Sequence, residues 1–147
     1  MKSHYRVVVI GGGVVGASVI YHLSKFGWKD ICLLERSVLS AGSSWHAAGG
    51  IHALNADPNM SALQAYTIDL LPQVEKESGE NIGLHMTGGL TMAGTPERWE
   101  WLQSAYRVYQ SIGIEDCRLV TPQEASKLNP IMSTEGLLGG MWADREG

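Results

Sequence analysis

The stretch VVVIGGGVVGASVI, from Val7 to Ile20, decides the fold of this 147-residue chain. Its first four residues, Val7–Ile10, are apolar and β-branched, which predicts a strand buried on both faces, as in a parallel sheet. Three glycines follow in G-x-G-x-x-G spacing. The apolar residues beyond them recur at helical spacing up to a C-cap at Gly27, namely Val15, Val19, Ile20, Leu23 and Phe26. The sequence therefore predicts a strand, a glycine-rich loop and a helix in succession.

A second apolar run, Ile31–Leu34, predicts the strand that completes a βαβ unit, and an acidic residue follows it. This acid, Glu35, comes about 20 positions after the last glycine, which is the spacing of a carboxylate that binds a ribose. The glycines permit a tight turn, a close backbone approach to a pyrophosphate and tight helix–strand packing, and the helix N-terminus faces the anion. The candidate dinucleotide-binding residues are therefore Gly11, Gly13, Val14, Val15, Gly16, Glu35 and Arg36. The unit alone does not distinguish NAD from FAD.

Composition and charge argue against several classes of partner. The 11 basic and 15 acidic residues give a formal charge of −4, and the basic residues are scattered, so no nucleic-acid surface is expected. No apolar run reaches the roughly 18 to 20 residues of a membrane span. Cys32 and Cys117 stand alone, which predicts reduced thiols and no metal site. Because the first strand starts so close to Met1, we expect no leader and a cytoplasmic protein, or a mitochondrial matrix protein if a leader has been removed.

The segment GSSWHAAGG, Gly42 to Gly50, carries the most specific signal. Together with VVVIGGGVVGAS and LLER, it resembles the flavoprotein family that includes dimethylglycine dehydrogenase, sarcosine dehydrogenase and dimethylglycine oxidase, within the D-amino-acid-oxidase-like superfamily. The resemblance implies FAD as the cofactor. It also implies a covalent bond from a ring nitrogen of His46 to the 8α carbon of the flavin. A neutral imidazole held against that carbon can act as the nucleophile.

The residues around His46 suit a large planar ring. Small residues let the backbone run close to it, the serines and Gly42 offer turns and hydroxyls, and an aromatic side chain can pack as a wall. We therefore add to the cofactor-binding candidates Gly42, Ser43, Ser44, Trp45, His46, Ala47 and Gly49. No catalytic acid, base or nucleophile for a substrate is identifiable in these 147 residues.

The activity that the resemblance implies is oxidative demethylation of an N-methylated glycine derivative, of the dimethylglycine or sarcosine class. The enzyme would transfer a hydride from a small-molecule amine to the bound flavin, with an electron acceptor that the sequence leaves open. Tetrahydrofolate is a further expected partner of a full-length protein. Three alternatives stay open: a noncatalytic regulatory subunit resembling a flavoprotein, an inactive truncated gene product, and an NAD-dependent dehydrogenase, which leaves the GSSWH segment without an explanation.

The chain as a whole reads as α/β, with a Rossmann-like FAD-binding βαβ unit followed by the start of an α+β substrate domain. We expect a division into residues 1–58, part of a doubly wound sheet, and residues 59–147, an incomplete domain of a larger fold. The predicted elements of the second part are a helix over 59–78 kinked at Pro72, strands at 84–86 and 90–93 forming a hairpin, a helix from Thr95 to Gly113, a capped helix from Thr121 to Asn129 and a strand over 136–143.

Overall fold

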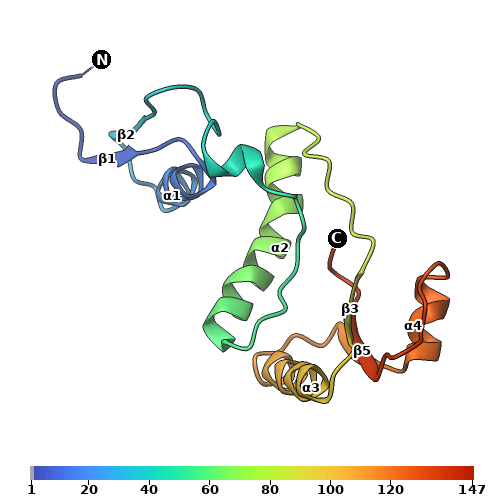
Figure 1. The fold of residues 1–147 in the computed structure, drawn as a ribbon. Helices are drawn as coiled ribbons and strands as arrows, with labels where there is room; N and C mark the ends of the chain where they lie inside the picture. Colours follow the sequence, from blue (N-terminus) through green and yellow to red (C-terminus); the bar gives the residue numbers. More distant parts are fainter. Residues whose placement is uncertain (1) are drawn as a thin grey trace. The chain divides into compact units, whose positions relative to one another are not determined.

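The computed structural model describes residues 2–147, which fall into two compact units, residues 2–49 and residues 50–147. Figure 1 shows the order of their elements along the chain. We call them unit 1 and unit 2 and describe each by itself. The domain division at residue 58 remains a prediction.

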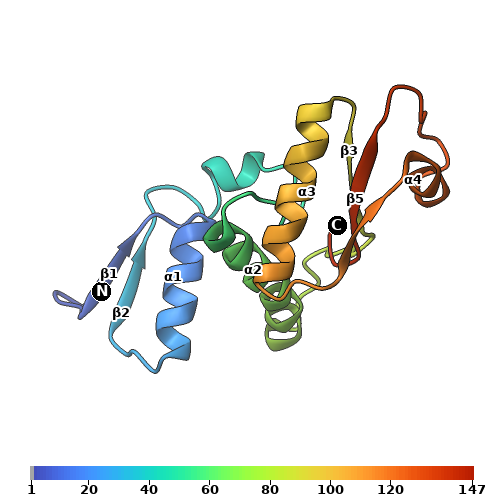
Figure 2. The same ribbon diagram turned by 90° about the horizontal axis from the view of Figure 1, so that it is seen from below.

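Unit 1 contains the βαβ motif predicted from the glycine-rich stretch. β1 (Val7–Ile10) and β2 (Ile31–Leu34) pair in parallel, with the first residue of one opposite the first residue of the other. α1 (Val14–Lys25) runs along one face of the two strands, as Figure 2 shows. A short 3₁₀ turn, η1 (Ser43–His46), follows. The predicted strand–helix–strand succession is confirmed.

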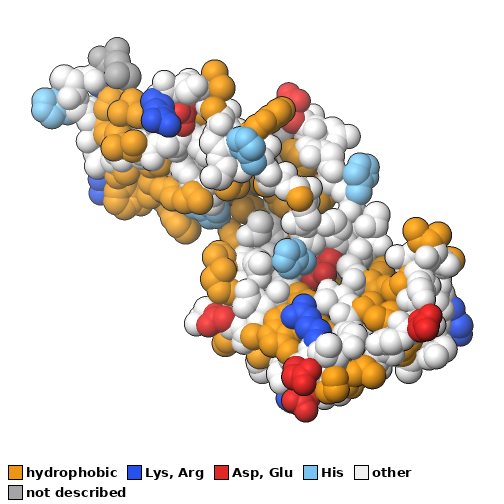
Figure 3. Space-filling model, in the orientation of Figure 1, with side chains coloured by type: hydrophobic (Ala, Val, Ile, Leu, Met, Phe, Trp, Pro, Cys, Tyr) orange, Lys and Arg blue, Asp and Glu red, His pale blue; other side chains and the backbone are white. Residues whose placement is uncertain are grey.

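The two-stranded sheet of unit 1 is covered on one face only. Along β1, Val7 and Val9 are half-buried, whereas Val8 and Ile10 have exposed fractions of 45% and 85%. Because successive side chains of a strand point to opposite faces, the alternation means that α1 covers one face and leaves the other open. Figure 3 shows hydrophobic side chains gathered on the surface of this unit. The expectation that β1 is buried on both faces is therefore wrong within unit 1.

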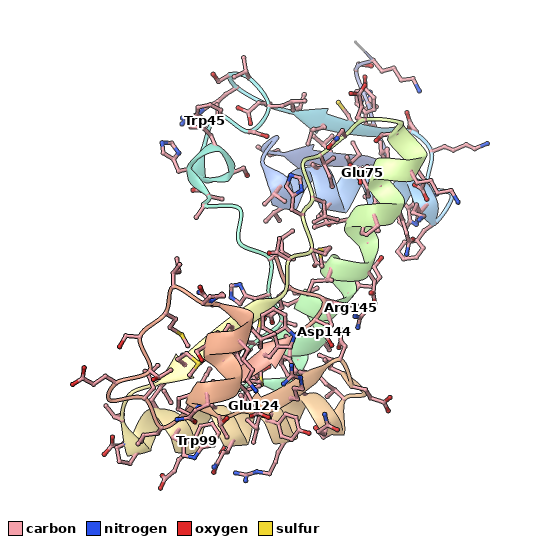
Figure 4. The ribbon with its side chains drawn as sticks, turned by 90° about the vertical axis from the view of Figure 1, so that its right-hand side faces the viewer. Trp45, Glu75, Trp99, Glu124, Asp144 and Arg145 are labelled. Carbon is pink, nitrogen blue, oxygen red and sulfur yellow. The ribbon has the colours of Figure 1, made fainter. Side chains whose placement is uncertain are left out.

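Unit 2 is built on a three-stranded antiparallel sheet. β5 (Gly139–Ala143) lies in the centre, between β3 (Gly89–Ala93) and β4 (Cys117–Val120). The central strand begins at Gly139, where close packing excludes a side chain: a Cβ at this position would lie 2.8 Å from the ring of Trp99. Trp99, labelled in Figure 4, thus packs directly against the backbone of β5.

Three helices of unit 2 begin at residues whose side chains accept a hydrogen bond from the first turn. They are α2 (Pro58–Ser78), α3 (Pro96–Ser111) and α4 (Pro122–Leu128), with caps at Asp57, Thr95 and Thr121. Each places proline in its first turn, where a missing N–H costs nothing. The predicted capping box of α4 is confirmed, since Thr121 and Glu124 satisfy each other's backbone N–H groups. α2 continues past Pro72 to its end at Ser78.

The predicted hairpin of residues 84–86 and 90–93 is wrong. Residues 84–86 form no strand, and β3 pairs instead with β5, with Gly89 opposite Ala143. A contact between residues far apart in sequence takes the place of the hairpin. The N–H of Gly88 donates to the carbonyl oxygen of Glu146 at 2.7 Å, so the segment before β3 is hydrogen-bonded to the chain beyond β5. A partner some 50 residues away in sequence cannot be seen in a local pattern.

Two further differences concern strand assignments. The sequence analysis missed β4, whose four residues, Cys117–Val120, are too few to show a clear alternation. The predicted strand over 136–143 begins only at Gly139, because Gly136 has a left-handed φ of 72° and the N–H of Leu137 donates to Thr134 in a turn.

The core of unit 2 lies between α3 and the sheet. Its most buried large side chains are Leu102 and Tyr109 on α3, the helix predicted from Thr95 to Gly113. A charged residue also enters this core. Glu146 has an exposed fraction of only 7%, and its Oε1 accepts hydrogen bonds from the Ala53 N–H at 3.1 Å and the Tyr109 hydroxyl at 3.3 Å. Burial raises the pKa of Glu146 above the ordinary glutamate value, while these hydrogen bonds act in the opposite direction.

The raised pKa of Glu146 predicts a pH-dependent difference between the wild type and Glu146→Gln. A carboxyl whose pKa is higher in the folded state stabilises the fold below its ordinary pKa, and that contribution is lost as pH rises through the folded-state pKa. We therefore expect the free energy of unfolding of the variant, relative to wild type, to increase as the pH rises above the ordinary glutamate pKa. Urea unfolding followed by tryptophan fluorescence measures it, with Glu135→Gln, an exposed loop glutamate, as the matched control. A difference that stays constant with pH contradicts the prediction.

Candidate functional site

The glycine-rich loop of unit 1 owes its shape to two close backbone contacts. Gly11 has a φ of 105°, which favours glycine, and its N–H donates to the Leu34 carbonyl at 2.8 Å, linking the end of β1 to β2. Gly16 lies in α1 directly against Gly11, and a Cβ on it would overlap the Gly11 carbonyl oxygen. These two positions therefore require glycine for the packing of α1 on β1, before any ligand is considered.

Glu35 lies at the end of β2 and is held by backbone donors. Its Oε2 accepts from the Gly12 N–H at 2.7 Å, and its Oε1 accepts from the Ser37 N–H at 2.9 Å. The hydrogen bond from Gly12, followed by that from Ser37, holds the pKa of Glu35 below its ordinary value. The side chain is thus an ionised acceptor at the edge of the loop, as a ribose ligand requires.

Sequence reasoning missed Gly12. A Cβ at this position would lie 2.6 Å from Cδ2 of Leu39 and 3.1 Å from Cβ of Glu35. The sequence does contain a signal for Gly12. It lies in a run of three glycines, and the G-x-G-x-x-G pattern explains only Gly11 and Gly13 of that run. Gly12 brings the loop and the acid together.

The predicted flavin-attachment segment forms the η1 turn and its flanks. The N–H of Trp45 donates to both Ser40 and Gly42 carbonyls, at 3.1 and 3.2 Å, which closes the turn. Trp45, labelled in Figure 4, projects outward with an exposed fraction of 77%. Ala47 is the C-cap of the turn, and Gly49 beyond it has a left-handed φ of 80°. Small residues here leave the surface around the turn open.

His46 ends the turn with its ring orientation determined by one hydrogen bond. Its Nδ1 lies 3.0 Å from the carbonyl oxygen of Gly42. A carbonyl oxygen only accepts, so the proton of this hydrogen bond is on Nδ1. In the neutral ring the lone pair then resides on Nε2, and the side chain is exposed. In that tautomer Nε2 is the ring nitrogen that the Gly42 hydrogen bond leaves unoccupied.

Two hydrogen bonds join this turn to the glycine-rich loop. The Oγ of Ser44 accepts from the Val14 N–H at 2.8 Å, and the Ser40 N–H donates to the Gly12 carbonyl at 3.0 Å. The structure thus brings the two predicted groups of site residues together in unit 1. Arg36 is exposed beside Glu35, and no hydrogen bond or ion pair of its side chain is found within residues 2–147.

The donors and acceptors of this site match the parts of an adenine dinucleotide. The first turn of a helix offers N–H groups and a partial positive charge to a pyrophosphate, and α1 begins at Val14 directly behind the glycine-rich loop. The Glu35 carboxylate supplies a ribose acceptor, and no atom lies within 4 Å of a Cβ built on Gly11. The residues present therefore fit the cofactor predicted from the sequence.

Fold and site together define a dinucleotide-binding α/β protein. The family model described as DAO, FAD dependent oxidoreductase, matches residues 6–147, and the chain belongs to this family. The cofactor class of the family is therefore FAD, as the sequence analysis predicted.

Individual proteins are similar to this chain over nearly its whole length. It is 33% identical to the mitochondrial dimethylglycine dehydrogenase of Rattus norvegicus over 99% of its own length and 17% of that protein. It is also 33% identical to the mitochondrial pyruvate dehydrogenase phosphatase regulatory subunit of Mus musculus, over 99% of its length and 16% of that protein. The crystal structure of L-proline dehydrogenase from P. horikoshii superposes with a TM-score of 0.89 at 22% identity, over all of this chain and 38% of that one. The chain thus spans about a sixth of the length of these curated relatives.

Residues 2–147 contain neither a metal-binding cluster nor a membrane-spanning helix. No group of three or more histidine, cysteine, aspartate or glutamate side chains in this part of the chain could hold a metal ion. The helices found there are too short or too polar to cross a membrane.

The contact between Gly16 and Gly11 predicts a strong effect of Gly16→Ala. The added methyl group overlaps a backbone carbonyl that cannot move without disrupting β1, so we expect a loss of about 1–3 kcal/mol in the free energy of unfolding and weaker FAD binding. Chemical denaturation and flavin-binding titration measure the two effects. Gly50→Ala is the control, because a Cβ at Gly50 meets no atom within 4 Å. Equal free energies of unfolding for Gly16→Ala and Gly50→Ala would contradict the prediction.

Proposed function

We propose that this chain forms the cofactor-binding part of an FAD-dependent amine oxidoreductase that oxidatively demethylates N-methylated glycine derivatives. The observation that supports it most directly is the state of His46: an exposed imidazole with the proton on Nδ1, on a turn hydrogen-bonded to the glycine-rich loop. Family membership supplies the flavin, and the name of the rat relative supplies the substrate class.

In this proposal each site residue has a distinct task. The N–H groups of the first turn of α1, together with Gly11 and Gly13, bind the pyrophosphate. Glu35, held ionised by Gly12 and Ser37, accepts hydrogen bonds from the ribose hydroxyls. The bound flavin supplies a hydride acceptor for the substrate amine. Trp45 provides an aromatic surface close to the attachment point.

His46 is the proposed covalent attachment residue, through Nε2. The hydrogen bond from Nδ1 to the Gly42 carbonyl fixes the neutral tautomer whose Nε2 lone pair is nucleophilic. Replacing a C–H bond of the flavin 8α-methyl group with a bond to Nε2 releases two electrons and two protons, one proton from the carbon and one from the ring. Dioxygen is a sufficient acceptor for both, giving hydrogen peroxide. The attachment then prevents loss of the cofactor.

The proposal also covers the substrate and a second small-molecule partner, and it has one rival. A small amine of the dimethylglycine or sarcosine class is the proposed substrate, and tetrahydrofolate is a proposed partner of a full-length protein. Noncatalytic regulation is the rival function, because a regulatory subunit matches this chain as well as a dehydrogenase does. A regulatory role needs no covalent oxidant, so the state of His46 favours the enzyme.

Flavin attachment to His46 is directly measurable. We expect the purified wild-type chain to carry a mass increase of one FAD that survives acid denaturation, and its band to fluoresce in a denaturing gel. His46→Ala should lose both signals while still binding FAD noncovalently, because the pyrophosphate and ribose contacts remain. Intact-mass spectrometry and gel fluorescence measure the two proteins side by side.

His46→Asn is the matched control, since it keeps a polar side chain but not the imidazole. Wild-type protein that binds FAD yet carries none after denaturation would remove the covalent role of His46. Wild-type protein that binds no FAD at all would favour the regulatory function.

A further inference from the structure

Ser44 occupies the position where the two halves of the candidate site meet. It is half-buried, whereas the other residues of η1, Ser43, Trp45 and His46, are exposed. Its Oγ accepts a hydrogen bond from the N–H of Val14, the first residue of α1. That N–H is one of the four that a helix cannot satisfy by itself. Ser44 therefore serves as a cap for α1, supplied from 30 positions further along the chain.

The residue that normally provides this cap has no side chain here. Gly13 is the N-cap of α1 and makes no side-chain hydrogen bond. A Cβ at Gly13 would lie 3.1 Å from Ser44 Oγ, which is tighter than an ordinary contact. The second glycine of the motif thus makes room for the hydroxyl of Ser44 as well as for an approaching ligand.

The segment leading into η1 is held by a second tie. The Ser40 N–H donates to the Gly12 carbonyl, and its own carbonyl accepts from the Trp45 N–H. Ser40 adopts a left-handed φ of 67°, a conformation that costs a non-glycine residue free energy and that the surrounding hydrogen bonds maintain. The turn that carries His46 is therefore fixed to the loop at Ser40 and at Ser44.

We propose that Ser44 is a positioning residue that couples occupation of the pyrophosphate site to the placement of His46. A hydroxyl can accept one hydrogen bond and donate another at the same time. While Oγ accepts from Val14, the Ser44 O–H can donate to a phosphate oxygen at the start of α1. Because His46 follows two residues later in the same turn, fixing Ser44 to a bound phosphate also fixes the backbone that carries the imidazole. The consequence for flavin attachment rests on the proposed function, whereas the tie between Ser44 and Val14 does not.

The first experiment measures that tie without any cofactor. Amide hydrogen exchange of Val14 is compared in the FAD-free wild type, Ser44→Ala, Ser44→Thr and Ser24→Ala. Loss of one hydrogen bond predicts exchange about three- to tenfold faster in Ser44→Ala. Ser44→Thr keeps the hydroxyl and should exchange at nearly the wild-type rate. Ser24→Ala removes a hydroxyl near the other end of α1, where it bonds only to Ile20, and should leave Val14 unchanged.

The second experiment measures the consequence for His46. The rate of covalent FAD incorporation is followed by gel fluorescence at saturating FAD, so that weaker binding cannot slow it. We expect Ser44→Ala to incorporate flavin about tenfold more slowly and Ser44→Thr to restore the rate. A serine that merely stabilised the fold would leave the saturated rate of the folded protein unchanged. Thermal unfolding of the variants checks that both remain folded.

The outcomes separate this inference from the proposed function. Unchanged Val14 exchange in Ser44→Ala overturns the tie, and an unchanged saturated rate overturns the coupling. If the wild type binds FAD but forms no covalent bond, the proposed role of His46 fails. The Val14 exchange rates with and without bound FAD then decide the role of Ser44: extra protection by FAD that Ser44→Ala loses supports it, and equal protection in both proteins overturns it.

Discussion

The close approach of α1 to the end of β1 is the constraint on which unit 1 depends. The helix can pack at this distance only because Gly16 has no side chain to meet the Gly11 carbonyl. Once α1 is fixed there, its first N–H groups point to a defined place beyond the loop. Glu35 and Ser44 then each find a backbone donor, from Gly12 and Val14, within 2.8 Å. The site is therefore a consequence of helix–strand packing rather than a separate arrangement of side chains.

The charges of the site are arranged so that an acid and an anion can lie close together. A carboxylate beside a pyrophosphate is unfavourable unless each negative charge has its own donors. Glu35 takes the N–H groups of Gly12 and Ser37, which hold its pKa low. The N-terminus of α1 remains for the phosphates, with the positive end of its dipole. Gly12, between the two, thus donates to the acid, while in the proposed function its neighbours bind the anion.

Local patterns predicted the parts of the fold whose causes are local. The βαβ unit and the beginnings of α3 and α4 all follow from spacing within about 20 residues. The pairing of β3 with β5 and the burial of Glu146 depend on residues far apart in sequence, and both escaped the sequence analysis. The same division holds in the site. The turn at Gly11 and the close packing at Gly16 were predicted from the motif, and the ribose role of Glu35 stays a prediction, whereas the Gly12–Glu35 and Val14–Ser44 hydrogen bonds could not be read from the sequence.

Sequence identity by itself does not separate an enzyme from a regulatory relative, because the chain is equally similar to one of each. The glycine contacts and Glu35 do not separate them either, since any protein that binds the cofactor needs these features. The η1 turn is different. The hydrogen bond from Nδ1 of His46 to the Gly42 carbonyl sets the tautomer of the neutral ring, in which the lone pair is on Nε2 of an exposed side chain. The imidazole of His46, held by Gly42 on a turn that Ser44 joins to α1, is therefore the feature of unit 1 on which the proposed enzymatic function depends.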